Sequence, residues 1–433
     1  MRFSACLGLL AATALVSASP VQERDEENTV VVVTNKVVVV EDCSKKIAPK
    51  VFIISMFDPE ADIWYSNAHT KGSIGNLLAK NITVPGFSPL FPQAHCLEDG
   101  SVCQLTTGES EINAATTINS LVLSPLFDLT KTYFLIAGIA GISPKHGTIG
   151  GVAISKFAIQ VALQYEFDAR SIPSNFSTGY VPLGSTSPDE YPQNIYGTEV
   201  FEVNEALRDI AVAWAKTAKL NDSDTAIAYR KNYASTADGA NPAIYAAGTQ
   251  KPGIYTCDVA TSDVYYSGTL LGEAFENTTT LFTNGSATYC MTAQEDNATL
   301  EALLRAALHK TVDFSRVIVM RTASNFDRPY PGLSDIDALF YITSGGFTPS
   351  LANLYIAGTP IIKGILENWE KTFEKGIKPK NYIGDIFGTL GGEPDFGPGS
   401  VFGGKPATVE DVEIQLRKRT LAKRGLGKMS MFM

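Results

Sequence analysis

The stretch at residues 131–155, KTYFLIAGIAGISPKHGTIGGVAIS, constrains the fold more than any other part of the chain. It predicts a buried strand (YFLIAGIAG), a Gly-Ile-Ser-Pro turn, a short polar loop and a second strand (VAIS). Because glycine lacks a Cβ, Gly138 and Gly141 let backbone amides approach a ligand at the carboxyl edge of a sheet. The same glycines are also typical of ordinary turns, so both interpretations stay open at this point.

Two further segments place this strand in an α/β fold. Residues 50–57 (KVFIISMF) form a near-continuous apolar run, which is typical of a parallel strand covered on both faces. Residues 106–129 have apolar side chains near helical spacing and lead directly into the strand of residues 131–155. A strand, a crossover helix and a second strand are the signature of a βαβ unit.

The two ends of the chain differ from its body. Residues 1–18 have a cationic start, an apolar run and small residues, which predict a secretory signal peptide. Residues 19–48 are acidic and then valine-rich, and we interpret them as a flexible or cleavable leader with Lys45-Lys46 as the candidate processing site. The body then covers residues 49–405, and residues 406–433 form a basic tail expected to be disordered or cleaved. We therefore expect a secreted or cell-surface protein.

Cysteines and sequons fit a secretory pathway. The chain has six cysteines, and removal of Cys6 with the signal peptide leaves five. Cys96 and Cys103 enclose a short loop and are the predicted disulfide. Cys257 with Cys290 is a candidate second pair that stays open here, and it would leave Cys43 free or removed. Asparagines head six N-x-S/T sequons and predict a glycoprotein, with some chance matches among them: Asn81, Asn175, Asn221, Asn277, Asn284 and Asn297.

The sequence lacks the motifs of several classes of enzyme and binding protein. The formal net charge is −10 and the body has no basic block, which argues against nucleic acid as a partner. The four histidines have no i,i+4 pair, so we expect no metal site. G-x-S-x-G, Walker A and G-x-G-x-x-G motifs are absent, and the sequence predicts no cofactor. A pocket without metal or cofactor remains.

Several motifs in the right order carry a family likeness. MFDPEADIW, TTGESEINAATT, AGIAGISP, GTIGG, CMTAQEDNATLEALLRA and RTASNFDRP resemble those of the fungal purine nucleoside permease family, from about residue 48 to 400. That family is similar to the nucleoside phosphorylases. The resemblance implies one α/β domain with a mixed, partly barrelled central β-sheet flanked by helices, and a nucleoside pocket on the loops at the carboxyl edge.

The resemblance also implies site residues. Substrate-binding positions would be Asp58, Gly138, Gly141, Asp263, Tyr265, Glu295 and Asp296. Asn325 and Asp327 would be catalytic, because cleavage of an N-ribosidic bond requires a hydrogen bond or proton for the departing base. Glu295 would accept from the ribose hydroxyls, and Tyr265 would stack on the base.

These positions also have structural interpretations that stay open. Asp263 is suited to capping a turn, and Glu295 and Asp296 to the first turn of a helix. Tyr265 would then belong to the core, and Asp327 would form an ion pair with the arginine that follows it.

Departures from the phosphorylase pattern bear on the reaction. The two phosphate-binding arginines of the phosphorylases are replaced by Ala61 or Asp62 and by Ile136. Nearby Glu60 and Glu109 would repel a dianion. Water as the nucleophile, or binding without cleavage, fits these losses better than phosphorolysis.

We therefore expect a protein that supports purine-nucleoside uptake by binding nucleosides outside the membrane, with hydrolysis of the N-ribosidic bond as an open extension. Two alternatives remain. One is a permease component that needs an integral membrane transporter as its partner. The other is a phosphorylase whose phosphate site uses Arg321, Arg328 or Lys145. The oligomeric state also stays open, with a homo-oligomer among the alternatives.

Overall fold

The computed structural model of the 433-residue chain describes residues 29–34, 37–42, 46–386 and 390. The predicted signal peptide, Cys43 and the basic tail lie outside these residues. The chain divides into two compact units between Lys45 and Lys46, at the dibasic pair. In the first unit, two valine-rich segments of the predicted flexible leader form an antiparallel strand pair, β1 (Thr29–Thr34) and β2 (Val37–Asp42).

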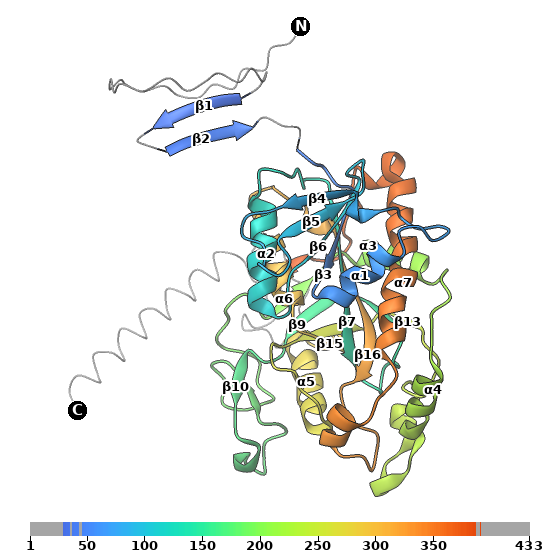
Figure 1. Cartoon of the computed structure of the whole chain (residues 1–433). Helices are drawn as coiled ribbons and strands as arrows, with labels where there is room; N and C mark the ends of the chain where they lie inside the picture. Colours follow the sequence, from blue (N-terminus) through green and yellow to red (C-terminus); the bar gives the residue numbers. More distant parts are fainter. Residues whose placement is uncertain (1–28, 35–36, 43–45, 387–389, 391–433) are drawn as a thin grey trace, which may run out of the picture. The chain divides into compact units, whose positions relative to one another are not determined.

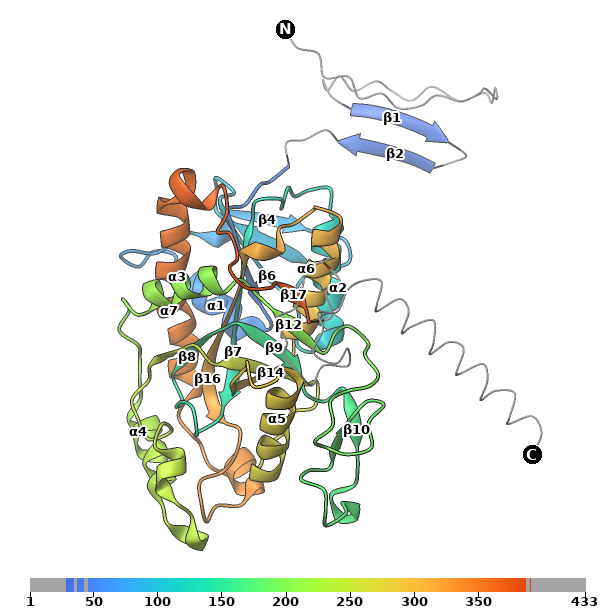
Figure 2. The same cartoon turned by 180° about the vertical axis from the view of Figure 1, so that it is seen from behind.

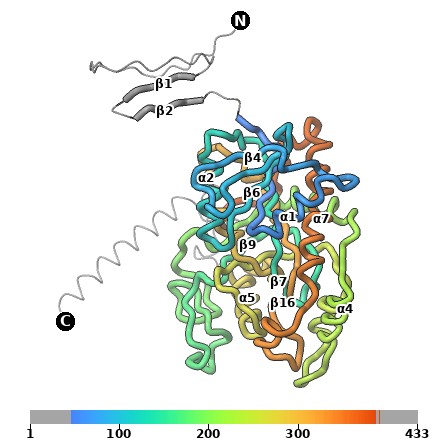
Figure 3. The backbone as a smooth tube through the Cα atoms, in the orientation of Figure 1, coloured from blue at the N-terminus to red at the C-terminus, as the bar shows by residue number. Residues whose placement is uncertain are grey.

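The second unit is built on a mixed sheet of thirteen strands. Figure 1 shows this sheet, and Figure 3 traces the course of the backbone. Its main path runs β17-β12-β9-β14-β15-β7-β3-β6-β5-β4, and β16, β8 and β13 branch from β7. A separate antiparallel pair is formed by β10 (Gln164–Glu166) and β11 (Tyr180–Pro182). The strands of the large sheet are β3 (Val51–Ser55), β4 (Lys80–Thr83), β5 (Gln93–Cys96), β6 (Val102–Thr106), β7 (Tyr133–Ile142), β8 (Val152–Ser155), β9 (Phe157–Gln160), β12 (Val200–Glu202), β13 (Ile254–Tyr255), β14 (Asp258–Thr261), β15 (Tyr289–Ala293), β16 (Val317–Phe326) and β17 (Gly384–Asp385).

Strand β7 is the centre of this sheet, and with β8 it confirms the two strands predicted in residues 131–155. It pairs in parallel with β3 over its first half and with β16 along its length, and antiparallel with β15 at its end. Only Lys156 separates β8, which pairs with β16, from β9, which pairs with β14. The sheet therefore curls partly around on itself, as expected.

Helices cover both faces of the sheet (Figures 1 and 2). Val51 and Ile53 of β3 join the core beneath α1, α3 and α7, whereas Phe52 and Ile54 join the core beneath α2 and α6. This alternation follows from the two-residue period of a strand and explains its continuous apolar sequence. The helices are α1 (Asp58–Ser66), α2 (Glu111–Leu123), α3 (Glu205–Ala215), α4 (Asp224–Lys231), α5 (Thr269–Phe282), α6 (Asp296–Leu308) and α7 (Phe347–Glu367). In the described part of the chain, none of the helices is both long and apolar enough to cross a membrane.

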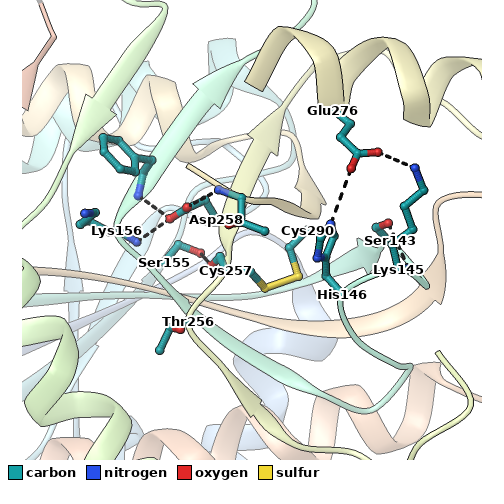
Figure 4. Close-up of a disulfide and its surroundings, with 12 residues drawn as sticks. Ser143, Lys145, His146, Ser155, Lys156, Thr256, Cys257, Asp258, Glu276 and Cys290 are labelled. Carbon is teal, nitrogen blue, oxygen red and sulfur yellow. Dashed lines mark hydrogen bonds and ion pairs between the residues drawn. A yellow bond between two sulfur atoms is a disulfide. The ribbon is translucent and has the colours of Figure 1, made fainter. Parts of the chain in front are cut away.

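The predicted disulfide and the candidate second pair are both formed. Cys96–Cys103 joins β5 to β6, and Cys257–Cys290 joins the start of β14 to β15. Beside the second bridge, the Asp258 carboxylate accepts hydrogen bonds from the backbone N–H groups of Lys156 and Phe157 at 3.0 and 2.8 Å (Figure 4). The bridge and this carboxylate hold β14, β15 and the β8–β9 segment together.

One predicted glycosylation sequon is excluded by its burial. Asn297 lies in α6, is 2% exposed, and donates through Nδ2 to the carbonyl oxygen of Thr198 at 2.8 Å. A buried amide that is already hydrogen-bonded cannot carry a glycan in the folded protein. The sequon at Asn297 is therefore a chance match.

The lengths of chain closed by the two disulfides predict different stabilities. Cys257 and Cys290 are 33 residues apart, whereas Cys96 and Cys103 are 7 apart. Replacing the longer pair with serine should lower the free energy of unfolding by about 2–4 kcal/mol. The shorter pair should cost about 1 kcal/mol less, because less loop entropy is constrained. Denaturant titration of the two double variants measures this; equal losses, or a larger loss for the shorter pair, would contradict it.

Candidate functional site

A cavity of about 310 Å³ opens where β7, β15 and β16 end. Seven separate parts of the chain supply its wall, so the cavity exists only in the folded chain. Its lining comprises Met56, Phe57, Glu60, Glu109, Ile139, Ala140, Gly141, Ser262, Val264, Tyr265, Tyr266, Thr292, Ala293, Gln294, Glu295, Arg321, Ser324, Asn325 and Phe347.

The floor of the cavity carries a buried guanidinium surrounded by carboxyl groups. Arg321 of β16 is 1% exposed, and its Nη2 lies 3.0 Å from Glu295 Oε2 and 2.8 Å from Asp296 Oδ2. Its Nη1 donates to the carbonyl oxygen of Ile139 at 3.1 Å. A buried charge is stable only with such partners. Arg321 therefore fixes Glu295 at the wall of the cavity.

Glu60 is the third carboxyl group of this cluster. Its Oε2 accepts from the Met56 N–H at 2.7 Å, and its Oε1 accepts from the Ile139 N–H at 2.6 Å. Burial raises the pKa of the Glu60 carboxyl to about 8, against the opposing effects of Arg321 and the two N–H donors. Glu60 can therefore change its protonation state near neutral pH.

The two predicted glycines serve different purposes. A Cβ on Gly138 would lie 2.5 Å from Arg321 Nη1 and 2.9 Å from Glu60 Oε1, so this glycine makes room for the charged cluster. Our expectation that Gly138 contacts ligand does not match its position, because it is not part of the cavity lining. Gly141 does line the cavity, and a Cβ there would lie 2.4 Å from Thr292 Oγ1.

The lining of the cavity also includes an amide and an aromatic ring. The pairing of β16 with β7 shifts register between Ala323 and Asn325, and such bulges redirect side chains near sites. Asn325 Nδ2 donates to the Tyr265 hydroxyl at 3.1 Å, and Asn325 Oδ1 accepts from the Ser324 hydroxyl at 2.9 Å. Tyr265 is 61% exposed and so does not belong to the core.

Four predicted residues thus line one cavity: Gly141, Tyr265, Glu295 and Asn325. Asp58 does not, because it lies exposed in the first turn of α1. Asp263 also lies outside the lining. Its Oδ1 accepts from the Ser110 hydroxyl at 2.6 Å and from the Glu111 N–H at 2.8 Å, so it caps the start of α2, whereas its structural interpretation was the cap of a turn.

Asp296 and Asp327 are buried away from the cavity as well. Asp296 is fully buried at the start of α6 and pairs with Arg321, so it supports the floor from behind. Asp327 accepts from Arg328 Nε and Nη2, both at 2.9 Å, and from the Tyr289 hydroxyl at 2.8 Å. The ion-pair interpretation fits this position of Asp327, whereas its predicted catalytic role has no access to the cavity.

Sequence reasoning missed Glu60 as a cavity residue, counting it only as a repelling charge. The four-residue spacing between Glu60 and Trp64 could have indicated this position, because residues four apart share one face of a helix. In α1 that shared face is buried. Within the described residues, no group of three or more His, Cys, Asp or Glu side chains is arranged to hold a metal ion.

Comparisons with known proteins agree on one family. The family model described as "Purine nucleoside permease (NUP)" matches residues 48–378. A purine nucleoside permease of Candida albicans (strain SC5314) is 50% identical over 355 residues, covering 81% of this chain and 83% of the relative. A probable purine nucleoside permease of Schizosaccharomyces pombe is 41% identical over 332 residues, covering 74% and 90%.

The solved structures that match this chain have much lower sequence identity. A 5′-methylthioadenosine/S-adenosylhomocysteine nucleosidase from S. pneumoniae has a TM-score of 0.42 at 12% identity, covering 73% of this chain and 99% of that one. Futalosine hydrolase from Helicobacter pylori has a TM-score of 0.41 at 13% identity, covering 74% and 98%. The family model and the fungal relatives decide the assignment: this chain belongs to the purine nucleoside permease family.

Proposed function

We propose that this protein binds purine nucleosides outside the membrane and hydrolyses their N-ribosidic bond. The observation that carries the proposal is the joint position of Tyr265, Asn325, Glu295 and Glu60 around one cavity of about 310 Å³. An aromatic ring and an amide suit a heterocycle, and carboxylates suit sugar hydroxyls and water. The fungal relatives named purine nucleoside permeases support the choice of ligand.

Each end of the nucleoside has a matching wall. The base would stack on Tyr265 and receive a hydrogen bond from Asn325 Nδ2, which now donates to the Tyr265 hydroxyl. The ribose would lie over Glu295, whose Oε1 accepts from the Ser110 N–H at 3.0 Å and whose Oε2 accepts from Arg321. Each carboxylate oxygen has a second lone pair, so Glu295 can still accept from the 2′- and 3′-hydroxyls.

Glu60 acts as the general base that accepts a proton from the attacking water. As the bond between C1′ and the base nitrogen breaks, its electron pair leaves with the base, and Asn325 donates a hydrogen bond to the departing heterocycle. Water adds to C1′ and gives a proton to the Glu60 carboxylate, and the departing base takes up one proton, either from Glu60 or from solvent. The products are free ribose and free purine.

The cations near the cavity argue against phosphate as the nucleophile. Arg321 is the one cation among the described residues that line the cavity, and it pairs with Glu295 and Asp296. Arg328 pairs with Asp327 and Glu273, both at 2.9 Å. Lys145 lies 2.7 Å from Glu273 and from Glu276. All three cations named as a relocated phosphate site are therefore already neutralised by carboxylates.

A second candidate function uses the same cavity without cleavage. The relatives carry the name permease, and a binding protein that delivers nucleosides to an integral membrane transporter would match that name. Tight nucleoside binding without any product would favour this carrier over the hydrolase.

Replacing Glu295 with Gln should weaken nucleoside binding at least about tenfold, because a charge-assisted acceptor of the ribose hydroxyls is lost. The amide keeps the shape of the carboxyl but not its charge beside Arg321, so thermal unfolding of the variant is measured first and the titration is run below its unfolding transition. Calorimetric titration with inosine, adenosine and guanosine measures the change. Asp58→Asn is the matched control, since this exposed carboxylate lies outside the cavity and its replacement should leave affinity unchanged. Equal affinities for both variants would refute the role of Glu295.

Hydrolysis should release free ribose at a rate that does not depend on added phosphate, and Glu60→Gln should lower that rate at least about 100-fold. Chromatography of base and sugar products measures both effects. Formation of ribose-1-phosphate that scales with phosphate would overturn the proposed nucleophile, and an undiminished rate in Glu60→Gln would remove this residue from the mechanism.

The pKa of Glu60 sets the pH dependence of this reaction. The acting form is the carboxylate, so kcat/KM should rise about tenfold per pH unit below the pKa and level off above about 8. Protonation at lower pH removes the base, so activity should fall as pH drops from 8 to 6. A profile that is flat over this range, or that rises toward acid, would contradict the assignment.

A further inference from the structure

A second cavity adjoins the first one and has the same volume, about 310 Å³. Both cavities share Ser262, Val264, Tyr265 and Tyr266, the segment between β14 and α5. We call the second cavity the annex. Its other lining residues are Ala162, Glu166, Tyr180, Ser267, Leu271, Phe275, Asp335, Ile336, Leu339 and Phe340.

The inner wall of the annex is a packed group of aromatic rings. The centroid of Phe275 in α5 lies 4.5 Å from the ring of Tyr266 and 4.7 Å from that of Tyr180. The Tyr266 hydroxyl lies 3.1 Å from the Tyr289 hydroxyl, so the polar end of this ring is satisfied away from the annex. This wall is therefore held in place and offers apolar ring surface to the cavity.

The outer wall belongs to the segment around the π-helical turn η7 (Asp337–Tyr341). Leu339 and Phe340 of this turn line the annex, and Phe340 is 71% exposed. Large apolar side chains at a surface are a feature of ligand-binding clefts. The annex thus has an apolar inner wall and an apolar outer wall.

Charge restricts what the annex can hold. Its two charged lining residues are Glu166 and Asp335, both exposed carboxylates, and none of the described residues that line it is a cation. Negative groups such as a phosphate or a carboxylate would therefore be repelled. An uncharged apolar group would gain from leaving water.

The annex meets the base end of the first cavity. Tyr265, which would stack on the heterocycle, belongs to both linings, whereas Glu60, Glu295 and Arg321 line the first cavity alone. A group that enters the annex must therefore extend from the base, and a group on the sugar would lie over the charged floor.

We propose that the annex binds an uncharged apolar substituent carried by the purine base, so that base-alkylated or base-arylated purine nucleosides are preferred ligands. This inference rests on the proposed nucleoside site. Tyr265 forms the partition between the two cavities and is held by the hydrogen bond from Asn325. Rotation of this exposed ring would join the annex to the base position.

Surface plasmon resonance with the full secreted chain tests this, because fresh ligand flows continuously and cleavage does not deplete it. N6-benzyladenosine should bind roughly tenfold or more tightly than adenosine, since the benzyl group buries apolar surface. Leu339→Trp fills the annex and should abolish this preference while leaving adenosine affinity unchanged. Leu270→Trp is the matched control, because Leu270 is 84% exposed and lines neither cavity.

The outcomes separate the two proposals. If adenosine binds and the benzyl compound binds no more tightly, the annex proposal is overturned and the nucleoside site stands. The annex proposal is also overturned if Leu339→Trp and Leu270→Trp have equal effects on the preference. If neither compound binds, the nucleoside site fails and the annex proposal fails with it. Sedimentation of the wild type and of Phe340→Asp tests a second copy of the chain as the occupant. If the wild type is a dimer that dissociates in this variant, and no preference for the benzyl compound is seen, the exposed apolar side chains belong to a dimer interface. That result overturns the annex proposal.

Discussion

The ion cluster around Arg321 is the interaction on which the site depends. A guanidinium with 1% exposure is stable only where carboxylates replace its water, and removal of one partner from such a pair costs about 3–5 kcal/mol. Here Glu295 and Asp296 replace that water from the start of α6, and Glu60 faces them from α1. The same cluster that stabilises the core therefore positions two carboxyl groups at the wall of the cavity.

The central strand makes this cluster geometrically possible. Strand β7 carries Gly138, where any side chain would collide with the guanidinium, and the amide of Ile139, which donates to Glu60. Its parallel pairing with β16 places Arg321 opposite Gly138 in register. On the other side, Cys257–Cys290 ties β14 to β15, the strands that lead to Tyr265 and Glu295. The cavity residues Tyr265 and Glu295 are thus fixed relative to each other.

The family name and the site differ in what they describe. A permease moves its ligand across a membrane, whereas the described residues form a cavity of about 310 Å³ lined by Glu60, a carboxyl group with a raised pKa. A protein that binds or cleaves nucleosides outside the cell would promote uptake by supplying the transported species. The apolar annex would add selectivity for the base, because its carboxylates disfavour anionic groups and its rings favour apolar ones.

The sequence by itself determined the buried strands β3 and β7 and the Cys96–Cys103 disulfide, because strand periodicity and the closure of a seven-residue loop act over short stretches. Motifs shared with a known family gave four residues of the cavity. Only the tertiary structure decided which acidic groups face the cavity. Asp263 accepts a hydrogen bond from Ser110, and Asp327 accepts one from Arg328. Glu60 instead lies with Trp64 on the buried face of α1. Those choices depend on contacts between strands and helices far apart in the chain, whose pairing no local pattern encodes.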